Sequence, residues 1–261
     1  MAGSPDRPTG SKFPPRDAER LLELLWARYE SEVPYARQFV ELAGAFRNDH
    51  VAFRSLKRPG GGVELLGHVF ERLGWRRAGG YEFPDTHLDA IYLAHPHGLP
   101  RVFLSQLLVE RLPGEARRIL EEIPREPPPP TEVEELADWF SGPQAPVREA
   151  DLLALDSVSQ YGAWVLAFGR KVNHFTASVD DIEAWDLRLR EAGVPMKPGI
   201  EGPQEGPLRQ TATLAAPLPV RVEGGGERHR PYAYLELAQR RPGFDGFLGA
   251  QARRLFDMTK R

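Results

Sequence analysis

Apolar side chains recur at three- and four-residue spacing in two stretches near the start of the chain, one from Arg16 and one opened by Pro34. This period is typical of amphipathic helices, and proline favours a first helical turn. Residues 16–46 are therefore predicted to form a helical cap that packs outside the main sheet. Residues 1–15 are rich in Pro, Gly and Ser and poor in apolar residues. They are predicted to be a disordered tail, because so few apolar groups cannot offset the entropy of ordering.

Strand and helix patterns then follow in the order β-α-β-β-β, and the same order appears twice. The two units cover residues 47–111 and 170–240. Their elements are predicted over residues 48–57, 62–75, 78–83, 88–95 and 101–110 in the first unit and over 171–178, 180–192, 208–214, 217–223 and 232–239 in the second. Two such units can curl one sheet around a central cavity.

Helical patterns fill the segment between the two units, residues 112–169, and the segment after them, residues 241–261. The first of these is predicted to be an insert of three helices, over residues 113–123, 131–140 and 149–168. The second is predicted to be a C-terminal helix. Residues 16–261 are therefore expected to form one α+β domain, in which paired β-α-β-β-β modules carry added helices.

Each unit places a histidine in its first strand, His50 in one and His174 in the other. Their matched positions in the repeat bring the two rings together. Glu236, in the last strand of the second unit, lies between two leucines, where a buried carboxylate needs a cation or strong donors. These three residues are predicted to hold one divalent metal. Gln106, on the last strand of the first unit, would be a neutral fourth group, or that position would stay open.

Two imidazoles and one carboxylate leave coordination positions open, and non-haem Fe(II) oxygenases use this arrangement to bind a chelating substrate with dioxygen. A structural zinc site would be closed by four ligands. Fe(II) is therefore the expected metal, with Zn²⁺, Ni²⁺ and Mn²⁺ as alternatives. Each residue also has an ordinary structural explanation, as a hydrogen-bonded core histidine or as a glutamate on a solvated sheet edge.

Strand alternation places Arg54 on the same face as His50. Its planar guanidinium suits a substrate carboxylate, although a salt bridge to a nearby acid would also explain it. Thr176 shares the face of His174, and Tyr234 shares that of Glu236. The candidate substrate-binding residues are Arg54, Ser55, Thr176, Gln210 and Tyr234.

Charge and composition exclude several kinds of partner. The formal net charge is -3, and long basic runs are absent, so nucleic acid and anionic membranes are not expected to bind. The chain has no cysteine, which excludes disulfides, thiolate ligands and a cysteine nucleophile. With neither an export leader nor a long apolar span, a cytoplasmic location is expected. A small ligand is the expected partner, and the oligomeric state stays open.

Several segments together resemble one known family. They are Asn48–Ser55 (NDHVAFRS), Val172–Thr176 (VNHFT), Gln210–Thr213 (QTAT), Tyr234–Arg240 (YLELAQR), Gly246–Phe247 and Phe256–Thr259 (FDMT). The chain resembles the 2-oxoadipate dioxygenase/decarboxylase family, related to the vicinal oxygen chelate superfamily, from about residue 17 to its end. It is similar to the shorter members, and it carries Gln239 where an acidic residue is commoner.

The resemblance implies a vicinal oxygen chelate-like fold around a metal cavity. It also implies Fe(II) held by His50, His174 and Glu236, with Arg54 as the catalytic-site arginine that recognises the substrate carboxylate. The implied reaction converts 2-oxoadipate and dioxygen to 2-hydroxyglutarate and carbon dioxide, within lysine catabolism. Two alternatives stay open: a non-redox isomerase or lyase on the same scaffold, and a protein that binds a small chelating ligand without turnover.

Overall fold

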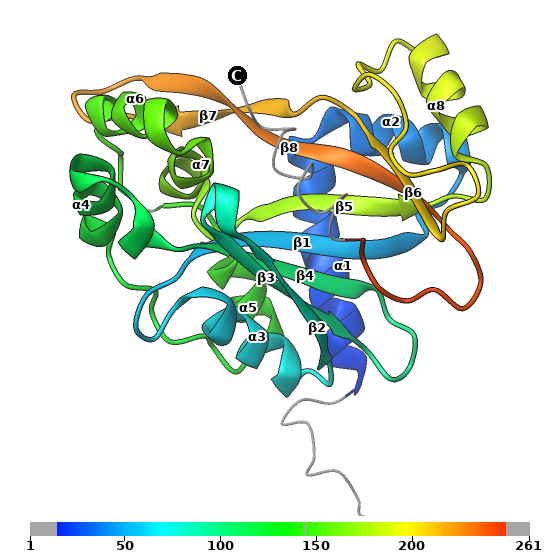
Figure 1. Ribbon diagram of the computed structural model, residues 1–261, viewed down its shortest axis with the longest axis horizontal. Coiled ribbons are helices and arrows are strands. Elements are labelled where there is room, and N and C mark those ends of the chain that lie inside the picture. The colour runs from blue at the N-terminus through cyan, green and yellow to red at the C-terminus, as the bar shows by residue number, and fades with distance from the viewer. Residues whose placement is uncertain (1–14, 144, 249–261) are drawn as a thin grey trace, which may run out of the picture.

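The order of elements expected from the sequence is present in a computed structural model that describes residues 15–143 and 145–248 (Figure 1). The cap and the first unit comprise α1 (Pro15–Glu32), α2 (Pro34–Ala43), β1 (Asn48–Leu56), α3 (Gly62–Arg72), β2 (Arg76–Phe83), the 3-10 turn η1 (Pro84–Thr86), β3 (Leu88–Ala94) and β4 (Arg101–Leu107). The insert comprises the 3-10 turn η2 (Val109–Arg111), α4 (Gly114–Glu122), α5 (Val133–Trp139), α6 (Glu149–Val158) and α7 (Gln160–Phe168). The second unit comprises β5 (Val172–Ser178), α8 (Ile182–Glu191), β6 (Leu208–Ala212), β7 (Ala216–Arg221) and β8 (Glu227–Arg240).

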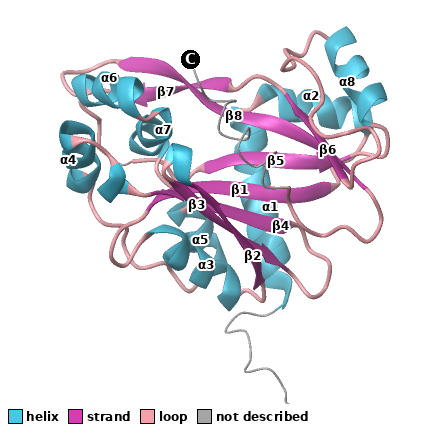
Figure 2. Cartoon of the chain, in the orientation of Figure 1, coloured by secondary structure: helices cyan, strands magenta, loops and turns pink. Residues whose placement is uncertain are grey.

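The strands of the described residues form one eight-stranded sheet in the order β2-β3-β4-β1-β5-β8-β6, with β7 paired to β8 (Figure 2). Within each unit the first and last strands run parallel, β1 to β4 and β5 to β8. The units meet where β1 and β5 pair antiparallel, which relates the inner strands by an approximate twofold axis. The outer strands depart from this symmetry, because the 14-residue β8 pairs with β7 along its first half and with β6 along its second. The predicted α+β class and curved sheet are confirmed.

Helices α1 and α2 pack against one face of the central strands and lie behind the sheet in Figure 1. Phe175 on β5 is fully buried there, and its ring lies 5.1 Å from those of Trp26 and of Tyr29, centroid to centroid. The Tyr29 hydroxyl also donates to the backbone oxygen of Tyr234 on β8. Burying one such side chain contributes roughly 1.5–3 kcal/mol. This packing holds the backs of the two strands whose front faces carry the candidate ligands.

The helical insert differs from its prediction at one point. The single helix expected over residues 149–168 is two helices, α6 and α7, because the backbone at Ser159 is extended (φ −150°, ψ 95°). The Ser159 side chain accepts a hydrogen bond from the backbone nitrogen of Gly162 and so caps α7. Serine at the start of a helix is a known capping signal, but the apolar period continues across this break and conceals it.

The predicted C-terminal helix over residues 241–261 is wrong for residues 241–248, which form turns and irregular backbone. This segment is tied to the sheet, because the Tyr81 hydroxyl on β2 donates to the backbone oxygen of Phe247 at 2.8 Å and accepts from its backbone nitrogen at 3.1 Å. Tertiary contacts have therefore replaced the local helical preference. Residues 249–261 and the predicted tail, apart from Pro15, lie outside the described residues.

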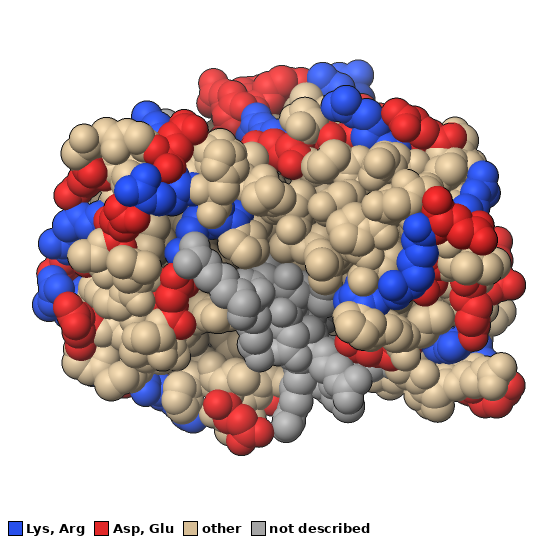
Figure 3. All heavy atoms as spheres, turned by 90° about the horizontal axis from the view of Figure 1, so that it is seen from above, with Lys and Arg blue, Asp and Glu red and all other residues tan. Residues whose placement is uncertain are grey.

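Basic and acidic side chains alternate around the rim of the face shown in Figure 3. Many charged side chains of the described residues pair locally, as Arg228 does with Glu149 at 2.5 Å and Arg148 with Asp151 at 2.8 Å. Exposed pairs of this kind contribute little to stability. Among the helices that the structure describes, none is both long and apolar enough to span a bilayer.

Candidate metal centre

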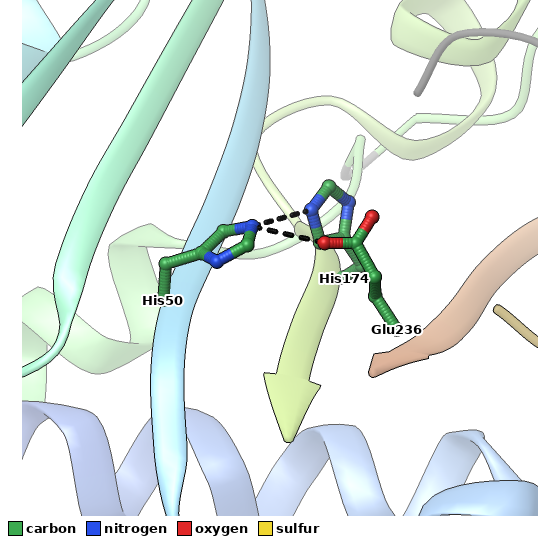
Figure 4. A group of neighbouring side chains, drawn as sticks. All are labelled: His50, His174 and Glu236. Atoms are coloured by element: carbon green, nitrogen blue, oxygen red, sulfur yellow. Dashed lines mark hydrogen bonds and ion pairs between the residues drawn. The ribbon is translucent and has the colours of Figure 1, made fainter. Parts of the chain in front are cut away.

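Strand register brings His50, His174 and Glu236 together. Across β1, β5 and β8, His50 is opposite Thr176, and Thr176 is opposite Glu236, so these side chains share one face of the sheet. His174 is opposite Ala52, two positions from His50, which places the two rings diagonally next to each other. Figure 4 shows both rings and the carboxylate directed toward a common point.

Two of the three distances between these side chains fit a shared metal ion. Their candidate ligand atoms all lie within 4.8 Å of one another. His50 Nε2 is 3.4 Å from His174 Nε2 and 3.3 Å from Glu236 Oε1. Two ligands, each roughly 2.1 Å from a metal and separated by about 90–109°, are about 3.0–3.4 Å apart. Each of the three residues is at most 2% exposed, so the cluster could hold a metal shielded from water.

The second nitrogen of each imidazole faces an oxygen from the preceding residue. His50 Nδ1 lies 2.8 Å from Asp49 Oδ1, and His174 Nδ1 lies 3.0 Å from Asn173 Oδ1. Both oxygens accept hydrogen bonds, so each ring carries its proton on Nδ1 when it is neutral. The lone pair is then on Nε2, the nitrogen that faces the cluster in both rings. This tautomer is the one that a metal requires.

The charges of the cluster are unequal. Burial lowers the pKa of His174 to about 3, against the opposing charge of Glu236, so this ring is neutral. Burial would also lower the pKa of His50, but hydrogen bonds and charges from Asp49 and Glu236 raise it above its ordinary value. Burial would raise the pKa of Glu236, yet the His50 hydrogen bond and both imidazoles hold it below its usual range. Without metal, His50 therefore carries the charge that balances Glu236.

Metal binding should release a proton from His50. At pH 6.5, its ordinary pKa, more than half of the His50 rings are charged in the metal-free protein, because the folded pKa is raised. A metal needs the neutral ring, so we expect release of more than half a proton per ion at pH 6.5, rising toward one as pH falls. The affinity should then weaken by up to about tenfold per unit fall in pH. The release should vanish as pH rises through the raised pKa. Calorimetry in buffers of different ionisation enthalpy measures it, and zero release at pH 6.5 would contradict the expectation.

Glu236 has further polar contacts. Gln210 Nε2 on β6 donates to Glu236 Oε1 at 2.6 Å, and Thr176 Oγ1 donates to the same oxygen at 3.2 Å. Thr176 Oγ1 is also 3.0 Å from His50 Nε2. These contacts fix the position of the carboxylate, since each removes some of its freedom to rotate. The ring of Tyr234 stacks on that of His174 with centroids 4.8 Å apart. Gln210, Thr176 and Tyr234 therefore contact the candidate ligands.

Arg54 points from the same strand face as His50, two strand residues beyond Ala52. It is 2% exposed, and its guanidinium carbon lies 5.0 Å from the ring centre of Tyr161 and 5.1 Å from that of Trp164, both on α7. Burial lowers the pKa of Arg54, while Tyr234 and Tyr161 oppose that shift. Cation–π contacts of this kind favour a desolvated guanidinium. The aromatic rings thus hold the buried positive charge of Arg54 near the three candidate ligands.

Ser55 and Gln106 lie on the other face of the sheet. Ser55 Oγ donates to the backbone oxygen of Ser105 at 2.7 Å, and Gln106 Oε1 accepts from the backbone nitrogen of Val63 at the start of α3. The position related to Glu236 by the twofold axis is occupied by Phe103, because Phe103 is opposite Ala52 as Glu236 is opposite Thr176. Of the two alternatives for the fourth position, a donor from Gln106 is therefore excluded.

A cavity of about 470 Å³ borders Arg54 and Ser55. It lies between α3, the end of α4 and the end of α7, and apolar side chains such as Leu66 and Val165 form much of its wall. Among the described residues that line it, none is a candidate metal ligand. The cavity therefore borders Arg54 but is separate from the three candidate metal ligands.

Comparisons with known proteins identify the family of this chain. Residues 129–259 match the model of the family described as 2-oxoadipate dioxygenase/decarboxylase. The chain belongs to this family. It is 26% identical over 217 residues to the chloroplastic 2-oxoadipate dioxygenase/decarboxylase of Arabidopsis thaliana, covering 74% of this chain and 58% of the relative. It is 27% identical over 243 residues to the chloroplastic/amyloplastic enzyme of Oryza sativa subsp. japonica, covering 81% and 66%. The chain thus spans less than two thirds of either relative.

A solved structure shows the same fold. The hydroxyglutarate synthase from Oryza sativa, in complex with 2-oxoadipate, superposes with a TM-score of 0.85 at 24% identity. The match covers 100% of this chain and 98% of that chain. The predicted family and its paired-module architecture are both confirmed.

Sequence reasoning overlooked several residues around the cluster. Asp49 and Asn173 each precede a candidate histidine, so their paired positions in the repeat were a usable signal. Tyr161 and Trp164 gave no such signal, because aromatic residues three apart on a helix are usual for core packing. Arg240, which contacts Asp49 at 2.6 Å, was equally inconspicuous among the many arginines of the chain.

Proposed function

We propose that this chain is an Fe(II)-dependent dioxygenase/decarboxylase that converts 2-oxoadipate and dioxygen to 2-hydroxyglutarate and carbon dioxide. The observation that carries the proposal is the buried His50–His174–Glu236 cluster with the guanidinium of Arg54 on the same face of the sheet. Family membership and the names of the curated relatives support it. Three protein ligands leave coordination positions open, which favours a catalytic Fe(II) site over a structural zinc site closed by four ligands.

Each side chain has a role that follows from its position. His50 and His174 would hold the metal through Nε2, and Glu236 through Oε1. A bound Fe(II) would supply the redox chemistry with dioxygen and would polarise the 2-oxo acid. Arg54 would bind the distal carboxylate through two parallel hydrogen bonds. Tyr161 and Trp164 keep water away from that guanidinium, which strengthens its attraction for the carboxylate.

The overall reaction balances without another reductant. The substrate loses the carboxyl carbon next to its keto group as carbon dioxide. One oxygen atom of dioxygen enters the new carboxylate, and the other becomes the 2-hydroxyl group. The four electrons that reduce dioxygen come from the substrate itself. The protein has only to orient the acid chain so that its shortened end stays beside the reacting centre.

Oxygen uptake tests the proposal. The protein would be loaded with Fe(II) without air and then mixed with 2-oxoadipate in an oxygen electrode. One dioxygen should be consumed for each carbon dioxide and each 2-hydroxyglutarate formed, and protein loaded with Zn²⁺ should consume no oxygen. Turnover of a carbonyl substrate with Zn²⁺ or Ni²⁺ and no oxygen uptake would favour the isomerase or lyase alternative. Tight binding of 2-oxoadipate without turnover would favour a binding protein. A role in lysine catabolism and a cytoplasmic location remain predictions.

A further inference from the structure

The carboxylate of Asp49 is buried beside the ring nitrogen of His50 that faces away from the other two candidate ligands. It is 6% exposed, and Asp49 Oδ1 lies 2.8 Å from His50 Nδ1. Adjacent residues on a regular strand point to opposite faces. The pairing of β1 with β5 is irregular between Asn48 and His50, however, and bulges of this kind redirect a side chain. The fold therefore places this carboxylate beside the imidazole that follows it.

Asp49 has two cationic neighbours as well. Arg240 Nε, on β8, donates to Asp49 Oδ2 at 2.6 Å, and Arg101, on β4, approaches the same oxygen at 3.8 Å. The side chains of Asp49 and Arg240 are only 4% and 9% exposed. The carboxylate is thus held ionised and fixed in place, on the side of His50 that faces away from His174 and Glu236.

The same two arginines hold the segment that follows β8. Arg101 Nε donates to the backbone oxygen of Asp245 at 2.7 Å, and Arg240 donates to that of Gly246. Arg240 also lies over the ring of Phe247, 5.0 Å from its centre. The Phe247 ring in turn meets the His50 ring edge-on, with centroids 4.8 Å apart. One carboxylate is therefore connected both to a candidate ligand and to the segment that covers it.

The related position in the second unit is a neutral amide. Asn173 Oδ1 faces His174 Nδ1 at 3.0 Å, and Asn173 is 3% exposed. Its Nδ2 has no hydrogen-bond acceptor among the described residues. The geometry around the two rings is thus alike, whereas the group that faces Nδ1 is charged at His50 and neutral at His174. A carboxylate that accepts from Nδ1–H makes Nε2 a stronger donor than an amide does.

We propose that Asp49 is a positioning residue that makes His50 the stronger of the two imidazole ligands and that anchors residues 244–247 against the His50 ring through Arg240 and Arg101. This inference rests on the proposed metal site. A stronger donor stabilises the higher oxidation state of a bound iron. The charge of Asp49 should therefore affect both metal affinity and the Fe(III)/Fe(II) reduction potential, neither of which depends on turnover.

Exchanging the two groups tests the inference. Asp49→Asn retains an acceptor for Nδ1–H but removes the charge. It should weaken Co²⁺ or Fe²⁺ affinity by roughly 10- to 100-fold, measured by competition with a chromophoric chelator, and make the reduction potential more positive. Asn173→Asp supplies His174 with the carboxylate and should make that potential more negative. Hydrogen exchange of residues 241–248 should rise in Asp49→Asn.

Arg240→Gln is the matched control. It leaves the Asp49 charge beside His50 but releases the covering segment. Exchange of residues 241–248 should therefore rise, while metal affinity and potential should change much less than in Asp49→Asn, because the Asp49 carboxylate remains beside His50 and near Arg101. A merely structural role for Asp49 would predict the same pattern for Asp49→Asn, and finding it would overturn the inference.

Two outcomes keep the inference separate from the proposed function. Wild-type protein that binds no divalent metal would overturn the proposed function and this inference together. Wild-type binding with an unchanged affinity and potential in Asp49→Asn would overturn the inference alone. If Asp49→Asn does not fold, the potential of Asn173→Asp decides, and an unshifted value there counts against the asymmetry between the two histidines.

Discussion

Alanine at His50, His174 or Glu236 should abolish stoichiometric metal binding and leave the fold intact. Removing a group that merely supports a ligand costs roughly 10- to 100-fold in affinity, so removing one of three direct ligands should cost on the order of 100-fold or more. Activity should fall with metal content. Metal analysis after dialysis measures the first effect, and circular dichroism with thermal unfolding checks the second.

The three variants should differ in their metal-free stability. Glu236 is a fully buried carboxylate that is balanced by His50. Glu236→Ala leaves a buried imidazole that can lose its proton, whereas His50→Ala leaves a buried carboxylate without that partner. His50→Ala should therefore be the less stable of the two without metal. His97→Ala, at an exposed turn, is the control and should change neither property. Normal metal content in any of the three ligand variants would contradict the assignment.

The sequence was sufficient to predict the parts of the site that depend on a repeat. Period-two and period-3.6 patterns identified the two units, and the matched histidines then required β1 and β5 to lie side by side. That pairing is observed, with His50 diagonal to His174. Prediction succeeded here because strand alternation and the approximate symmetry act on the same residues.

Register was the part that the sequence did not determine. Counting along the last strand of the first unit suggested Gln106, whereas the observed pairing of β1 with β4 puts Phe103 at the position related to Glu236. A shift of one residue moves a side chain to the opposite face. The turns that set such shifts carry little pattern of their own. For the same reason, the bulge that directs Asp49 toward His50 was not foreseen.

The helices around the sheet show a second limit. The break at Ser159 and the turns of residues 241–248 both oppose a local helical pattern. In each case specific contacts decide the outcome: the Ser159 cap on Gly162, and the hydrogen bonds of Tyr81 and Arg101 to the C-terminal segment. Propensity is a weak prior when tertiary contacts of this kind compete with it.

Arg54→Ala should leave metal content unchanged and strongly weaken a dicarboxylic 2-oxo acid. A guanidinium cannot ligate a cation, so the metal should be unaffected. The distal carboxylate, however, would lose a charge-assisted bidentate partner in a buried setting, at a cost of about 2–5 kcal/mol. KM for 2-oxoadipate should therefore rise by more than an order of magnitude. Steady-state oxygen uptake and metal analysis together measure this.

Companion variants separate charge from packing at this position. Arg54 lies against Tyr161 and Trp164, so alanine also leaves a void, whereas Arg54→Met fills much of it. The methionine variant should be more stable than the alanine variant and equally poor with dicarboxylates. Arg54→Lys should recover activity only in part, because an ammonium keeps the charge but loses the planar fork. Arg125→Ala, an exposed arginine on the neighbouring cavity, should resemble the wild type.

The choice of substrate makes the Arg54 result specific. A monocarboxylic 2-oxo acid has no distal carboxylate, so it should bind weakly to the wild type and lose little more in Arg54→Ala. The ratio of kcat/KM for the two acids should therefore collapse toward one in the variant. If both acids instead suffer equally, Arg54 must act on the carboxylate next to the keto group or on the packing of the site. The preference for a dicarboxylate would then have to come from another residue.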